Sequence, residues 1–149
     1  MTEYPLPEIS ERALNERRIG LGITGLGSMF AMMKMKYGSD ESLKFANTLF
    51  CNLRNYSYEE SVELAKEKGK FSAFDKEILQ SNFIKNLPVE IREGIKKHGL
   101  RNIALNTIAP TGTTSLTLGQ NCSGGIEPMF ALEYERNIRA KDNKKIKEK

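Results

Sequence analysis

The segment Ile108–Gly119 reads IAPTGTTSLTLG and predicts the passage from a strand into a helix. Residues 101–110 (RNIALNTIAP) form a β-type run that a proline ends. Residues 121–128 (NCSGGIEP) are loop-like, and residues 129–137 (MFALEYERN) alternate as a strand does. The C-terminal third therefore predicts a short strand–helix–strand unit, whose helix holds only about two turns.

Hydroxyl residues and a glycine stand where this helix is expected to begin: Thr111, Gly112, Thr113, Thr114 and Ser115. Free backbone N–H groups at a helix N-terminus, together with the helix dipole, bind phosphate. The glycine would let a ligand approach the backbone. The stretch has no lysine, so it is not a Walker A loop. It predicts a phosphate or diphosphate site, and a Thr/Ser-rich cap without a ligand explains the same residues equally well.

Most of the remaining chain predicts helices. From Ser39 the sequence SDES is typical of a helix start, and apolar residues then recur at helical spacing as far as Gly69. Residues 87–100 (LPVEIREGIKKHGL) predict a further helix with proline at its start and glycine at its end. Residues 1–10 hold two prolines and predict an extended strap.

Residues 19–27 (IGLGITGLG) contain Gly20-x-Gly22-x-x-Gly25, the spacing of a dinucleotide-binding fingerprint. That fingerprint has meaning only where a strand ends and a helix begins. Here it follows SERALNERR, which is polar and helix-prone. We therefore expect these glycines to allow close packing rather than to bind a dinucleotide.

Composition argues for one soluble domain without a metal site. The uncharged, largely apolar stretch Ile19–Met33 has 15 residues, fewer than the roughly 20 that span a bilayer. We therefore expect a cytoplasmic chain with no membrane partner.

Cys51 and Cys122 form no CxxC pair, so neither a zinc site nor a disulfide framework is predicted. His98, the only histidine, is expected to be a cation at a helix C-terminus.

The net charge of +4 is concentrated in the last 14 residues. Residues 136–149 hold seven Lys or Arg and two Asp or Glu, whereas the preceding 135 residues carry a net charge of −1. This predicts a mobile basic tail. The tail has no interleaved aromatic residues for base stacking, so nucleic-acid binding is not favoured.

Four blocks give the sequence a family resemblance: residues 17–27, 63–71, 95–115 and 123–136. In this order and spacing, RRIGLGITGLG, ELAKEKGKF, IKKHGLRNIALNTIAPTGTTS and SGGIEPMFALEYER resemble ribonucleotide reductase large (catalytic) chains. The sequence of these blocks is most similar to the adenosylcobalamin-dependent, class II branch. Class I chains, which take their radical from a metal-containing partner subunit, share the same layout.

The resemblance implies a helix-rich α/β fold that is a partial segment of a ten-stranded α/β barrel. It divides the chain into a strap (1–16), a reductase segment (17–136) and a basic tail (137–149). It also implies that the phosphates of a ribonucleoside di- or triphosphate are held by Thr111, Gly112, Thr113, Thr114 and Ser115. Residues 123–128 (SGGIEP) resemble the loop that follows and helps to shape the pocket.

The central signature of the family, N-x-C-x-E, does not occur around Cys51 or Cys122. We therefore predict no catalytic residue in this chain. The expectation is a split or truncated reductase that is active only with a polypeptide carrying the N-terminal half of the barrel. The alternative is a non-catalytic remnant, or an interaction module, that keeps the scaffold alone.

Overall fold

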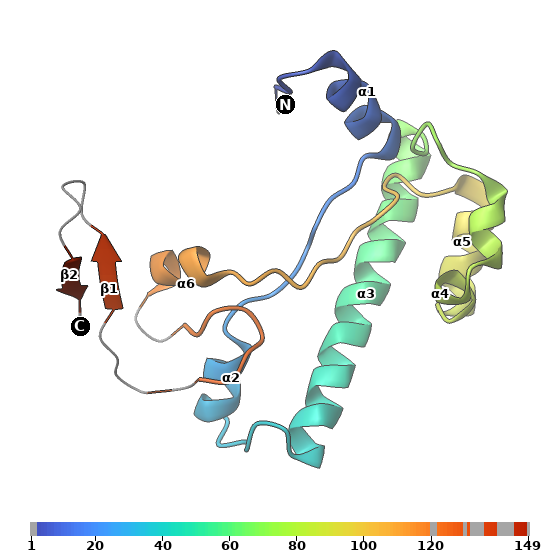
Figure 1. Ribbon diagram of the computed structural model, residues 1–149. Helices are drawn as coiled ribbons and strands as arrows, with labels where there is room; N and C mark the ends of the chain where they lie inside the picture. Colours follow the sequence, from blue (N-terminus) through green and yellow to red (C-terminus); the bar gives the residue numbers. More distant parts are fainter. Residues whose placement is uncertain (1–2, 120–121, 130, 132–135, 140–144, 149) are drawn as a thin grey trace. The chain divides into compact units, whose positions relative to one another are not determined.

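A computed structural model describes residues 3–119, 122–129, 131, 136–139 and 145–148 (Figure 1). The chain divides into two compact units. The first comprises Met1–Gly22 and Gly38–Ala109, and the second comprises Ile23–Tyr37 and Pro110–Lys149. The division separates the glycine-rich stretch between its second and third glycines, so each half of that stretch packs within a different unit.

The long helix α3 (Asp40–Lys68) dominates the first unit and follows the sequence prediction closely (Figure 1). Its N-cap is Ser39, whose hydroxyl accepts a hydrogen bond from the N–H of Ser42. Such a cap satisfies one of the N–H groups that lack a partner in a first helical turn. The helix ends at Gly69, whose φ of 78° is readily adopted by glycine. The predicted single long helix is confirmed.

Shorter helices complete the first unit: α1 (Pro7–Glu16), η1 (Lys76–Gln80), α4 (Asn82–Lys85) and α5 (Val89–His98). The prediction for α5 is confirmed, with Pro88 as its N-cap and Gly99 as its C-cap. The prediction of an extended strap over residues 1–10 is wrong from Pro7 onward. Proline is favoured in the first helical turn, because its φ is already helical and its missing N–H would have had no helical partner.

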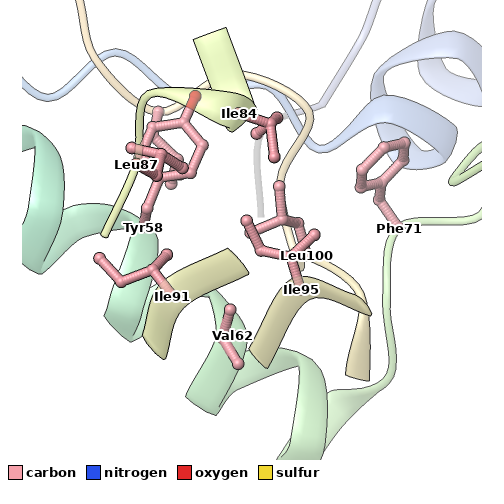
Figure 2. Packing of buried hydrophobic residues seen from close by; sticks show 9 residues of the cluster. Tyr58, Val62, Phe71, Ile84, Leu87, Ile91, Ile95 and Leu100 are labelled. Carbon is pink, nitrogen blue, oxygen red and sulfur yellow. The ribbon is translucent and has the colours of Figure 1, made fainter. Parts of the chain in front are cut away.

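A hydrophobic cluster joins α3, α4 and α5 with the segments that follow α3 and α5 (Figure 2). Its buried members are Tyr58, Val62, Phe71, Ile84, Leu87, Ile91, Ile95, Leu100 and Leu105. Gly94 of α5 lets this helix approach α3, because a Cβ placed there would lie 3.1 Å from Cγ1 of Val62. Ile95 and Leu100 are fully buried and form the centre of this cluster.

Residues 101–110 do not form the predicted strand. They run beside residues 19–21, where Ile19 N–H donates to the carbonyl of Ala104 and Leu21 N–H donates to that of Leu105. Only one isolated parallel bridge, between Leu21 and Asn106, results. A strand requires a run of paired residues, and this segment has too few paired positions among the described residues.

A buried polar group fixes the start of the same segment. The hydroxyl of Ser61 on α3 donates to Oδ1 of Asn102 at 3.1 Å and accepts from the N–H groups of Arg101 and Asn102. The amide nitrogen of Asn102 donates to the carbonyl of Arg17 at 2.8 Å. These bonds connect α3, residues 101–102 and the end of α1. One group of buried hydrogen bonds therefore holds three segments of the first unit together.

The second unit contains α2 (Leu26–Met32), α6 (Gly112–Leu118), β1 (Arg136–Arg139) and β2 (Lys145–Glu148) (Figure 1). The two strands pair antiparallel, with Arg136 opposite Glu148 and Arg139 opposite Lys145. Both strands lie within the basic segment 136–149, whose predicted mobility stays a prediction.

The predicted strand–helix–strand unit is not confirmed. Its helix is present as α6, but residues 129 and 131 are not in a strand. The rest of the expected second strand falls partly on residues outside the described ranges, and β1 begins only at Arg136. No helix among the described residues is long and apolar enough to cross a membrane.

Candidate phosphate-binding loop

Helix α6 places the predicted site residues at its first turn, with Thr111 at the N-cap and Gly112 as the first helical residue. Gly112, Thr113 and Thr114 are exposed, Thr111 is half-buried and Ser115 is buried. Nothing lies within 4 Å of the position where Gly112 would carry a Cβ. The structure therefore brings all five predicted residues together and leaves open space beside the glycine.

Two backbone N–H groups of this turn are available to a ligand. Among the described residues, no hydrogen-bond acceptor is found for the N–H of Thr113 or of Thr114. The hydroxyl groups of these two threonines also have no hydrogen-bond partner in the described part of the chain. Exposed donors at the start of a helix suit an anion, because the helix dipole adds partial positive charge there.

The other two hydroxyl residues of the predicted site make internal hydrogen bonds. Thr111 Oγ1 donates to Oγ1 of Thr24 at 2.7 Å and accepts from the N–H of Gly125 at 2.6 Å. Ser115 Oγ donates to the carbonyl of Gly112 at 2.8 Å. A hydroxyl has one proton to donate, so neither group has a proton left for a ligand. Both residues hold the turn in shape.

The SGGIEP segment lies against the start of α6. A Cβ on Gly124 would lie 3.5 Å from Cα of Gly112. Ser123 and Ser28 exchange hydrogen bonds, since each N–H donates to the hydroxyl of the other, at 2.7 and 3.1 Å. The loop is therefore fixed to the first turn of α2, and the first turn of α6 lies beside it.

The glycines of the fingerprint serve packing, as expected. Added Cβ atoms on Gly20 and Gly22 would collide with Thr107 in the first unit. In the second unit, Gly25 has a φ of 78° and faces Sγ of Cys122. A Cβ on Gly27 would lie 2.6 Å from the carbonyl oxygen of Glu127. Close approach of other backbone and side-chain atoms explains the spacing without a dinucleotide.

Sequence reasoning missed Thr24 and Ser28. Both lie within or beside the glycine stretch, and both contact residues 87 to 101 positions later in the chain. Nothing local marks such long-range pairs. A hydroxyl residue within a stretch of packing glycines was the one available signal, and it was too weak to use alone.

The remaining polar candidates form no second site. His98 lies in the last turn of α5, where a cation was predicted. Cys51 and Cys122 are free thiols. Across the described ranges, no group of three or more His, Cys, Asp or Glu residues is placed to hold a metal ion.

Comparison with known proteins gives a consistent result. A family model described as ribonucleotide reductase, barrel domain, matches residues 1–149. The vitamin B12-dependent ribonucleoside-diphosphate reductase of Mycobacterium tuberculosis is 36% identical over 138 residues, which are 93% of this chain and 18% of the relative. The protein of the same name from Thermoplasma acidophilum is 35% identical, over 91% of this chain and 16% of the relative.

A relative from yeast has a different name. Ribonucleoside-diphosphate reductase large chain 2 of Saccharomyces cerevisiae is 33% identical to this chain, over 91% of it and 17% of the relative. The chain therefore spans less than a fifth of the length of the curated relatives it matches.

Proposed function

Because this chain belongs to the ribonucleotide reductase family through its barrel domain, we propose that it forms the part of a reductase that holds the substrate's phosphates. The substrate would be a ribonucleoside diphosphate, the class that the relatives are named for, and the reaction would be its reduction to a deoxyribonucleotide. Residues 17–136 would be the reductase segment, between an N-terminal segment (1–16) that contains α1 and the basic tail (137–149).

The exposed first turn of α6 carries this proposal. Thr113 and Thr114 would donate backbone N–H and hydroxyl groups to phosphate oxygens, and Gly112 would leave room for the ligand beside the backbone. Thr111 and Ser115 would contribute through their internal hydrogen bonds, by fixing the geometry of the turn. The five predicted residues thus divide into two groups, one that contacts the ligand and one that supports it.

Adenosylcobalamin belongs to the proposal only at the level of the complete enzyme. Two of the relatives are named vitamin B12-dependent and the yeast relative is not. We assign no residue of this chain to this cofactor and derive no step through it. The chain would likewise need a further polypeptide that supplies the rest of the barrel and the N-x-C-x-E signature.

Reconstitution tests the proposal. The purified chain is mixed with a polypeptide carrying the N-terminal half of the barrel, and reduction of CDP is measured with and without adenosylcobalamin. We expect activity only in the mixture. The double variant Gly112→Ala/Thr113→Ala should raise KM about tenfold or more, by loss of direct ligand contacts. Thr117→Ala on the same helix is the matched control, because its exposed hydroxyl donates only to the carbonyl of Thr114.

Two results would contradict the proposal. An unchanged KM in the double variant would remove the loop from substrate binding. Failure of the chains to associate, with no reduction under any condition, would instead favour a non-catalytic remnant. A requirement for a metal-containing partner subunit in place of adenosylcobalamin would change the radical source and leave the role of the loop intact.

A further inference from the structure

A closed set of hydrogen bonds connects Thr24 to the candidate loop. The N–H of Gly125 donates to Oγ1 of Thr111 at 2.6 Å, and Thr111 donates its own proton to Oγ1 of Thr24 at 2.7 Å. Thr24 then donates to the carbonyl of Ser123 at 3.2 Å. Because Ser123 and Gly125 lie two residues apart in one loop, the bonds form a ring within the second unit.

The ring determines which way the N-cap residue of α6 points. The Thr111 hydroxyl donates its single proton to Thr24 and accepts a hydrogen bond from Gly125, so two hydrogen bonds fix the orientation of its side chain. Held in this way, Thr111 makes no side-chain cap bond to the first turn of α6, so the N–H groups of Thr113 and Thr114 stay uncapped. Thr24, which lies 87 residues earlier in the sequence, therefore influences the exposed N–H donors of Thr113 and Thr114.

We propose that Thr24 is a positioning residue for phosphate binding, acting through Thr111 without touching the ligand. The inference rests on the proposed function, because it needs a phosphate at the first turn of α6. Removal of the Thr24 hydroxyl would leave the proton of Thr111 without its acceptor, and Thr111 could then turn toward the ligand or toward solvent. The exposed N–H donors would no longer be kept uncapped, while the chain keeps its fold.

The test is a titration of the full ¹⁵N-labelled chain with inorganic pyrophosphate, followed through the amide resonances of Thr113 and Thr114. Thr24→Val removes the hydroxyl at nearly constant volume and should weaken pyrophosphate binding about three- to tenfold. Thr24→Ser keeps the hydroxyl and should restore the affinity. In the double variant Thr24→Val/Thr111→Val, the second change should add little to the first, because both break one ring.

Ser28→Ala is the matched control. It removes the bond from the Ser123 N–H to the Ser28 hydroxyl and keeps the bond from the N–H of residue 28 to Ser123 Oγ, so it weakens the anchoring of the same loop without touching Thr111. A role in stability alone predicts that Ser28→Ala and Thr24→Val lower the melting temperature and the affinity alike. The positioning role predicts that Thr24→Val weakens binding more than Ser28→Ala at comparable melting temperatures.

The outcomes separate this inference from the function on which it rests. If the unaltered chain binds pyrophosphate and Thr24→Val binds equally well, the inference is wrong and the loop assignment stands. If Thr24→Ser fails to restore the affinity lost in Thr24→Val, the hydroxyl is not responsible and the inference is also wrong. If the unaltered chain gives no shift at Thr113 or Thr114, the proposed loop function fails and takes the inference with it.

Discussion

Two glycine-to-alanine changes in the second unit should alter stability in opposite directions. Gly112 and Gly27 both lie in the first turn of a short helix, α6 and α2 respectively. Alanine is better than glycine in a helix by up to about 1 kcal/mol. At Gly112 a Cβ meets nothing within 4 Å, so the gain should appear undiminished. We expect Gly112→Ala to stabilise the chain by about 0.4–1 kcal/mol, or about 1–4 °C in melting temperature.

At Gly27 the same gain is outweighed by a collision. The new Cβ would lie 2.6 Å from the carbonyl oxygen of Glu127 and 3.2 Å from Oγ of Ser123. Real Cβ atoms do not approach another heavy atom within 3.0 Å, so the backbone of the loop must shift. Overpacking of this kind costs about 1–3 kcal/mol. We expect Gly27→Ala to be less stable than the unaltered chain by about 0.5–2 kcal/mol after the helix gain is subtracted.

Thermal unfolding followed by circular dichroism compares the two variants in one buffer. The sign of each change is the informative quantity, because both variants add the same methyl group to the same kind of helical position. A loss of more than about 1 kcal/mol in Gly112→Ala would show that its Cβ position is not open. A neutral Gly27→Ala would refute the close approach of residues 127–129 to α2.

Further predictions concern the first unit. Ile95→Ala, at a fully buried position, should lower the free energy of unfolding by about 2–5 kcal/mol in urea denaturation; a loss below about 1 kcal/mol would contradict the described core. Burial raises the pKa of Tyr58 above its ordinary value of 10.0, so the unfolded chain ionises first and stability should fall as pH rises above 10. Tyr58→Phe should remove this loss of stability at high pH. Tyr56→Phe, at a 67% exposed position, should retain it. Equal dependence of stability on pH in the two variants would contradict the assignment of the effect to Tyr58. Ser39→Ala should cost about 1 kcal/mol in the same urea assay through loss of the N-cap, whereas no change would show that the cap of α3 contributes nothing.

Sequence reasoning succeeded where the determining signal was local. The start of α3 could be predicted because the Ser39 hydroxyl accepts from the N–H only three residues later, and its end because Gly69 follows a basic last turn. The exposed first turn of α6 was readable for the same reason, since Pro110 and the following threonines mark a helix start. These signals depend on neighbours in the chain and on no distant partner.

Strands and hydroxyl pairs could not be predicted in this way. Residues 101–110 have strand-like composition, yet a strand needs a paired neighbour over several residues, and only Leu21 forms a bridge with them. The pairing of Thr24 with Thr111 joins positions 87 apart. Before the structure was known, Thr111 was simply one of five candidate phosphate ligands, and its internal role became visible only with its partners.

The most direct measurement of the central claim is a crystal structure of the chain, assembled with the rest of a reductase barrel and soaked with CDP. The account predicts that diphosphate oxygens lie within hydrogen-bond distance, about 2.7–3.2 Å, of the backbone nitrogens of Thr113 and Thr114. Thr111 should keep its bonds to Thr24 and Gly125. An ordered diphosphate bound elsewhere, with the first turn of α6 left in contact with solvent, would contradict the account.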